Sequence, residues 1–182
     1  MTRVAIFGGS FNPPHVAHVL AAAYVLATQE VDRLLVVPAF DHPFGKSLAK
    51  FDHRFAMCER AFADIRRVEV SDIERQLGGE SKTLFTLEAL AKSHPDWSMR
   101  LVVGGDILNE SHKWFAWDRV VALAPPIVLG RAGHPAPGAP SPLLPEIASR
   151  DLRAMLLEGQ DVGSLVARSV REYIAEHGLY RA

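Results

Sequence analysis

The chain has 182 residues, which is the size of one domain and is enough to bury a sizeable core, so we treat residues 1–182 as a single domain. Hydrophobic residues make up 48% and charged residues 23% of it, which excludes an intrinsically disordered chain. The formal net charge of −1 excludes a basic field for binding nucleic acid, and the single cysteine, Cys58, excludes an internal disulfide.

Apolar runs typical of buried strands alternate along the chain with longer helical patterns. Strands are predicted at residues 4–7, 33–38, 68–74 (a short strand and its exit), 99–106 and 126–131, and helices at 15–29, 51–65, 83–95 and 113–124. A Pro- and Gly-rich loop follows at 131–146, and residues 147–180 form two helical segments split at 159–163. This alternation predicts an α/β fold, a Rossmann-like open parallel sheet with helices on both faces and a C-terminal helical segment.

The start of the chain lacks a basic segment followed by a long apolar run, and no apolar run approaches the length of a membrane span. We therefore expect a cytoplasmic protein that binds neither membrane nor nucleic acid. The sequence allows a homo-oligomer but gives no oligomeric state.

The segment GGSFNPPHVAH, directly after the first predicted strand, is suited to binding an anion. Gly8 and Gly9 let the backbone turn sharply and bring its N–H groups close to a ligand, and Ser10 adds a hydroxyl. The two prolines precede a helix whose N-terminus offers N–H groups and the positive end of its dipole. His15 and His18 are three residues apart, so they share one face of the first turn and are expected to converge on a phosphate.

The sequence allows other interpretations of the histidine pair and offers a second candidate phosphate motif. The histidine pair could hold a metal or lie on the helix surface, but zinc proteases space their histidines at i and i+4 with a Glu between them. The letters FGKS at 44–47 resemble the end of a P-loop, but Phe40 stands where that motif needs Gly. Lys46 could still reach a phosphate as a point charge, or it could lie on the surface.

Two further segments carry residues suited to binding a nucleotide. Gly104 ends a predicted strand where backbone can approach a nucleotide, and Asp106 could accept from ribose hydroxyls or cap the next helix. Ser149 is a predicted N-cap, and Arg150 and Arg153 lie in the first turn after it, which indicates a second anion site.

These motifs resemble a known family. GGSFNPPHVAH is similar to the (T/G)xFxPxHxxH signature of the nucleotidylyltransferase superfamily. GGDIL, HKWFAW, IASRDLR and REYIAEHGLY resemble segments of bacterial nicotinate-nucleotide adenylyltransferases, so the resemblance runs from the first strand to Tyr180. It implies transfer of AMP from ATP to nicotinate mononucleotide, giving the dinucleotide and pyrophosphate.

The resemblance also implies roles for individual residues. Gly8, Gly9, Ser10 and Phe11 would line the phosphates, and His15, His18 and Arg153 would be catalytic. ATP would further contact Gly104, Asp106, Ser149 and Arg150, and the pyridine ring would meet Trp114 and the backbone of Thr86. Arg150 stands where the family motif ISSTxxR has Thr, and we expect it to point into the site and replace the missing hydroxyls.

No side-chain nucleophile is needed for such a reaction. The substrate's own phosphate is largely ionised at neutral pH because its second pKa is near 6. We expect Mg²⁺ to arrive with ATP and to be held mainly by phosphates, since no dedicated carboxylate cluster is visible. Two alternatives remain open: a superfamily member that uses a phosphopantetheine-type substrate, and a non-catalytic nucleotide-binding homologue.

Overall fold

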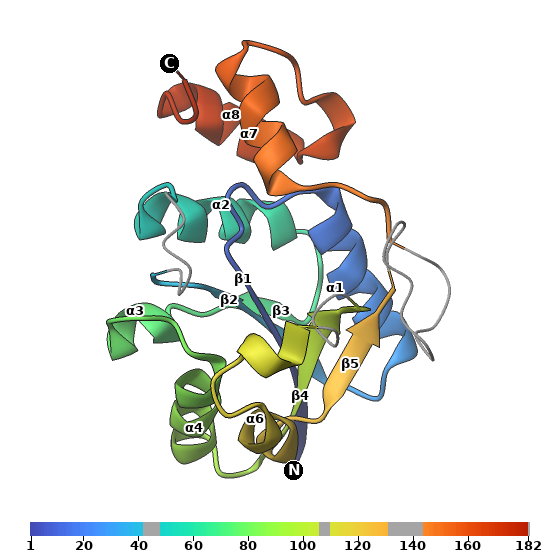
Figure 1. Cartoon of the computed structure of the whole chain (residues 1–182). Coiled ribbons are helices and arrows are strands. Elements are labelled where there is room, and N and C mark those ends of the chain that lie inside the picture. The colour runs from blue at the N-terminus through green and yellow to red at the C-terminus, as the bar shows by residue number, and fades with distance from the viewer. Residues whose placement is uncertain (42–47, 106–109, 131–143, 182) are drawn as a thin grey trace.

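The computed structural model describes residues 1–41, 48–105, 110–130 and 144–181. Its centre is a five-stranded sheet, drawn in Figure 1, in which every pairing is parallel and the strand order is β3-β2-β1-β4-β5. The strands are β1 (Thr2–Gly9), β2 (Arg33–Pro38), β3 (Val68–Val70), β4 (Trp97–Gly104) and β5 (Pro126–Leu129). Val4, Ala5 and Ile6 of β1 are buried because β1 pairs with a neighbouring strand on each side and helices cover both faces of the sheet.

Two helical layers enclose the sheet. On one face α1 (Val16–Thr28) and α2 (Phe51–Phe62) pack through small and aromatic side chains, and on the other α4 (Thr83–Ser93) and α6 (Trp117–Leu123) pack through Leu and Val. The short helix α3 (Ile73–Leu77) precedes α4. At the C-terminus α7 (Ser149–Leu157), η2 (Gly163–Leu165) and α8 (Arg168–Glu176) share a separate apolar cluster with α2, at the top of Figure 1.

The predicted α/β architecture is confirmed, with two local differences. Residues 73–77 form α3, where only the exit of a strand was expected, because the run is too short to show a helical period. The helix expected over 113–124 is divided into η1 (Ser111–Lys113) and α6, and Ala116 between them is left-handed with φ 51°. Cys58 is buried, and this burial raises the pKa of its thiol.

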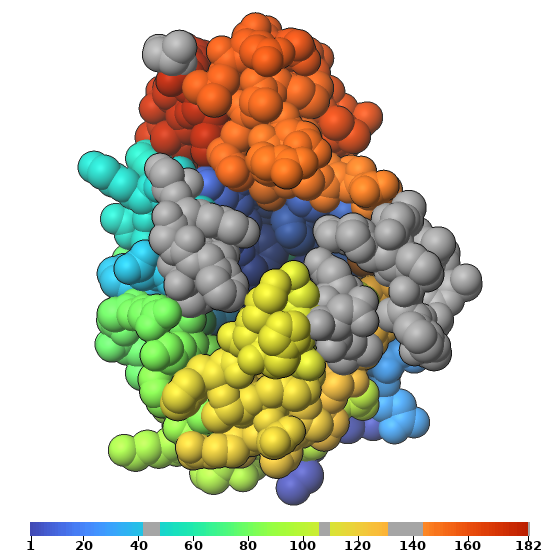
Figure 2. Space-filling model, viewed as in Figure 1, coloured from blue at the N-terminus to red at the C-terminus, as the bar shows by residue number. Residues whose placement is uncertain are grey.

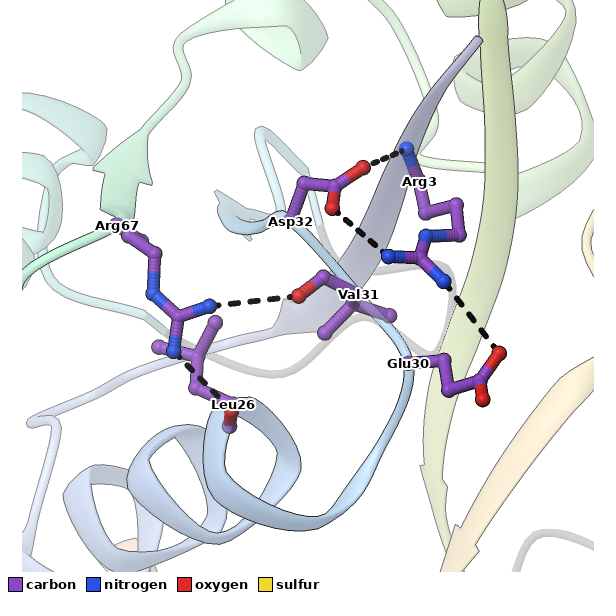
Figure 3. A network of polar contacts seen from close by, with 6 residues as sticks. All are labelled: Arg3, Leu26, Glu30, Val31, Asp32 and Arg67. Carbon is purple, nitrogen blue, oxygen red and sulfur yellow. Dashed lines mark hydrogen bonds and ion pairs between the residues drawn. The ribbon is translucent and has the colours of Figure 1, made fainter.

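A polar network lies at the amino-terminal ends of strands β1, β2 and β3 (Figure 3). Arg3 donates to Asp32 from its main-chain nitrogen at 2.8 Å and from its guanidinium at 3.1 Å, and this contact lowers the pKa of the Asp32 carboxyl. Arg67 donates to the carbonyl oxygen of Leu26 at 3.1 Å, which satisfies an acceptor near the end of α1. The network lies at the opposite end of β1 from its terminal glycines. Across the described ranges, no helix is long and apolar enough to cross a bilayer.

Candidate functional site

A cleft of about 520 Å³ opens at the carboxyl end of the central strands. This is where open parallel sheets bind ligands, and the size is typical of a ligand pocket. Figure 2 shows the molecule hollowed over its N-terminal segment (blue), between the C-terminal helices (orange) and the segment that follows β4 (yellow). The residues that matter for its chemistry are Gly8, Gly9, Ser10, Glu74, Glu80, Ser81, Lys82, Thr86, Glu110, Lys113, Trp114 and Phe115.

The two glycines at the end of β1 are needed for different reasons. A Cβ atom on Gly9 would lie 3.1 Å from the ring of Phe11, so a side chain there would press on a ring that is itself buried, and packing within the protein favours glycine. A Cβ atom on Gly8 would meet nothing closer than the Val37 carbonyl oxygen at 4.0 Å, and Gly8 lines the cleft. The protein itself therefore tolerates a side chain at Gly8, and the space in front of it is open to a ligand.

Phe11, expected to line the phosphates, has its side chain turned into the protein. Its backbone is left-handed, with φ 46°, and its ring is buried in the core between the sheet and α1. The ring packs edge-on against Phe62 and His18. Any contact of Phe11 with a ligand must therefore come from its main chain.

The histidines converge in the first turn of α1, as their spacing predicts. Their rings stack with centroids 3.8 Å apart, and the His15 main-chain N–H donates to Nδ1 of His18 at 3.2 Å. Because Nδ1 accepts this bond, the proton of the neutral His18 ring is on Nε2, which is therefore a donor. His15 is buried and His18 is half-buried, and neither ring belongs to the cleft lining.

The C-terminal segment holds the loop between the glycines and the histidines. The Ser149 hydroxyl donates to the Pro13 carbonyl oxygen at 3.0 Å, and the Arg153 guanidinium donates to the Asn12 carbonyl oxygen at 2.7 Å. The Tyr180 hydroxyl donates to Oδ1 of Asn12 at 2.6 Å, and burial raises its pKa. The first turn of α7 is thus brought beside the loop, as a second anion site requires.

Two expectations for this helix are wrong. The N-cap of α7 is Ala148 rather than Ser149, whose hydroxyl is used by the loop. The Arg150 side chain is 82% exposed and donates from Nε to Asp151 at 2.9 Å, so it does not point into the site. Ser149 faces the loop, and the next residue of a helix is turned about 100° away from it, which directs Arg150 to solvent.

Arg54 is a supporting residue that the sequence reading missed. It is buried in α2 and donates to the carbonyl oxygens of Ala49 at 2.9 Å, Ser10 at 3.0 Å and Phe40 at 3.1 Å. Burial lowers the pKa of its guanidinium. One side chain therefore joins the ends of β1 and β2 to the start of α2, where the sequence shows only an arginine in a helical pattern.

Glu74 is a second supporting residue that the sequence did not indicate, and it joins separate segments on the other wall of the cleft. Its carboxylate accepts from the Thr86 hydroxyl at 2.9 Å and from the Phe40 main-chain N–H at 3.0 Å. The Ser81 hydroxyl oxygen accepts from the same N–H at 2.9 Å. The Thr86 hydroxyl is thus engaged within the protein, and its main-chain N–H donates to the Lys82 carbonyl oxygen at 3.4 Å in the first turn of α4.

Trp114 and Thr86, predicted together as the ring-binding pair, both line the cleft. Trp114 lies in extended backbone between η1 and α6, with its ring edge-on to Trp117 at 5.3 Å. Gly104 ends β4, as predicted, but is not part of the lining, and Lys46 and Asp106 lie outside the described residues.

Comparison with known proteins decides the family. A family model described as cytidylyltransferase-like matches residues 6–155. A relative from Anaeromyxobacter sp. (strain K), named "Probable nicotinate-nucleotide adenylyltransferase", is 52% identical over 98% of this chain and 97% of its own length. One of the same name from Myxococcus xanthus is 42% identical over 98% and 94%. The chain belongs to the nicotinate-nucleotide adenylyltransferase family.

The fold of this family is also found among solved structures. The Plasmodium falciparum nicotinic acid mononucleotide adenylyltransferase complexed with NaAD aligns with a TM-score of 0.83 over 99% of this chain and 98% of that one, at 20% identity. A second structure of that protein, complexed with APC, aligns with a TM-score of 0.81 at 19% identity. At this level of identity the likeness shows the fold alone, and it agrees with the family drawn from the sequence motifs.

Proposed function

We propose that the chain transfers AMP from ATP to nicotinate mononucleotide, forming deamido-NAD and releasing pyrophosphate. The observation that carries this is one cleft that joins the strand end at Gly8–Ser10 to Thr86 and Trp114. Main-chain N–H groups where a strand ends suit phosphates, and a flat aromatic wall suits a pyridine ring. The names of the relatives supply the identity of the acceptor.

The reaction is a direct displacement at phosphorus. An oxygen of the mononucleotide phosphate forms a bond to the α-phosphorus of ATP while the bond from that phosphorus to the oxygen bridging to the β-phosphate breaks. Pyrophosphate leaves with the electron pair. The attacking phosphate is already ionised, so the protein's task is to align the two phosphates and to neutralise the charge that develops on the leaving group.

The residues proposed to act on the phosphates are of two kinds: some donate hydrogen bonds to a phosphate, and others hold those donors in place. Main-chain N–H groups of Gly8, Gly9 and Ser10 would hold the ATP phosphates, and Nε2 of His18 would donate to the leaving group. Arg153 has five N–H donors, so its bond to Asn12 leaves others for phosphate. His15, buried and stacked on His18, would fix the orientation of that ring.

The remaining assignments rest on the family. Trp114 would stack on the pyridine ring next to the Thr86 backbone, Gly104 would lie against the adenosine and Asp106 would bind its ribose. Lys46, assigned from its position after the second strand and not from the family, would reach a phosphate as a point charge.

Magnesium is proposed to enter with ATP. Among the residues that the structure describes, no three His, Cys, Asp or Glu side chains lie close enough together to hold a metal ion, so phosphate oxygens would supply most of its ligands. The bound ion would neutralise charge on the phosphates. The chain's own donors, including His18 and Arg153, would still orient those phosphates.

Pyrophosphate release by the purified protein tests the proposal. With ATP and Mg²⁺, we expect release with nicotinate mononucleotide, slower release with nicotinamide mononucleotide and none with phosphopantetheine. Omission of Mg²⁺ with a chelator present should abolish release. Release with phosphopantetheine alone would favour the other branch of the superfamily. ATP binding without release in any mixture would favour a non-catalytic homologue.

A further inference from the structure

The two pyridine mononucleotides differ in one group, which is a carboxylate on nicotinate and a neutral amide on nicotinamide. Stacking on Trp114 involves the ring face, which both substrates share, so it cannot discriminate strongly between them. The lining of the cleft gives no general attraction for a carboxylate either, because Glu74, Glu80 and Glu110 outnumber Lys82 and Lys113 in it. A cation placed locally at the ring substituent would select nicotinate.

Lys82 has the position that this role requires. It is the N-cap residue of α4, one helical turn before Thr86, whose main-chain N–H lies 3.4 Å from the Lys82 carbonyl oxygen. Its ammonium nitrogen lies 5.1 Å from the centroid of the Phe115 ring, and Phe115 follows Trp114 directly. Lys82 thus connects the two walls between which the pyridine ring is proposed to bind.

We propose that Lys82 recognises the carboxylate of the pyridine ring and makes the site select nicotinate mononucleotide over nicotinamide mononucleotide. This rests on the proposed function, because it names the specificity determinant of the same cleft. The Lys82 side chain is 33% exposed, so its charge is partly shielded from solvent, whereas the Lys113 side chain on the other wall is 48% exposed.

The present partner of Lys82 does not prevent this role. Its ammonium forms an ion pair with Glu80 at 3.1 Å, and the Glu80 side chain is 49% exposed. Ion pairs of this exposure contribute little to stability, so a substrate carboxylate can share or replace Glu80 at small cost. The ring substituent lies far from the reacting phosphates, so the contact is equally strong in the ground state and in the transition state. It should therefore lower KM and leave kcat unaffected.

The test compares KM and kcat for both mononucleotides in the full chain and in Lys82→Met, Lys82→Arg and Lys113→Met. Lys92→Met, a lysine on the exposed last turn of the same helix, is the matched control for loss of one charge. We expect Lys82→Met to reduce the preference for nicotinate mononucleotide, expressed as the ratio of KM values, by about tenfold or more, the effect of losing a charge-assisted contact. Lys82→Arg should retain most of the preference, and Lys92→Met all of it.

Binding of each mononucleotide is measured in parallel by calorimetry, which does not depend on turnover. If the unmodified chain released no pyrophosphate, the proposed function would fail, while a weaker binding of nicotinate mononucleotide to Lys82→Met would still support the assignment. An equal loss for both mononucleotides in Lys82→Met would overturn it, because the lysine would then only shape the cleft. A loss of preference in Lys113→Met but not in Lys82→Met would overturn it as well.

Discussion

Replacing His18 should separate catalysis from stability, because the two nitrogens of its ring have different tasks. Nδ1 accepts the His15 main-chain N–H at 3.2 Å, which satisfies a donor at the start of α1. Nε2 carries the proton that is proposed to reach the leaving pyrophosphate. His18→Ala removes both contacts, at a cost of about 1 kcal/mol in the free energy of unfolding for the lost cap. The lost transition-state donor should lower kcat by about 10²–10³-fold.

His18→Asn distinguishes the two effects. The Asn side-chain oxygen can take the place of Nδ1 and accept the His15 N–H, but the side chain is too short to replace Nε2. We expect its free energy of unfolding in urea to stay within about 0.5 kcal/mol of the unmodified protein, since the cap is retained. Its kcat should fall as far as in His18→Ala, with ATP affinity, measured by calorimetry, much less affected. A kcat close to that of the unmodified protein, or an equal loss of kcat and ATP affinity, would refute the reasoning.

Three more predictions concern the supports of the site. Gly8→Ala should keep or slightly raise the free energy of unfolding but weaken ATP binding, whereas Gly9→Ala, with its Cβ 3.1 Å from the Phe11 ring, should destabilise the fold by about 1–3 kcal/mol. Thermal melts and ATP titration check both variants. Normal ATP affinity in Gly8→Ala would contradict the proposal that the open space in front of Gly8 is filled by the ligand. Arg54→Met should cost about 3 kcal/mol or more in urea unfolding, because it leaves three part-buried carbonyl groups without their donor. A cost below about 1 kcal/mol would argue against its supporting role. Arg150→Thr should change ATP affinity less than about twofold, since the side chain faces solvent and exposed ion pairs are weak; a large, salt-sensitive loss would show that it turns inward when ATP binds.

The sequence predicted the parts of the structure that depend on local periodicity. The alternation of strands and helices and the stacked histidines at the start of α1 follow from spacing within a few residues. Gly8 and Gly9, expected to form a sharp turn, are instead the last two residues of β1 and pair with β2. The meeting of Thr86 and Trp114 in one cleft was also expected, though only through the family resemblance.

Contacts between distant segments could not be predicted in this way. Arg54 bonds to carbonyl oxygens from three loops, and Tyr180 reaches Asn12 across most of the chain, but neither residue has a local pattern that indicates a partner. The predicted direction of the Arg150 side chain was also wrong, because the sequence indicates the helix but not how the helix is rotated about its own axis. That rotation is set by the bonds of Ser149 and Arg153 to the loop.

The exchange of labelled pyrophosphate into ATP tests the central claim, direct transfer of AMP to a mononucleotide, most directly. Because the attacking group belongs to the substrate, exchange should require nicotinate mononucleotide and should be absent when the protein, Mg²⁺, ATP and labelled pyrophosphate are mixed alone. Exchange without the mononucleotide would reveal an adenylylated side chain and contradict direct displacement. No exchange in either mixture would contradict adenylyl transfer itself.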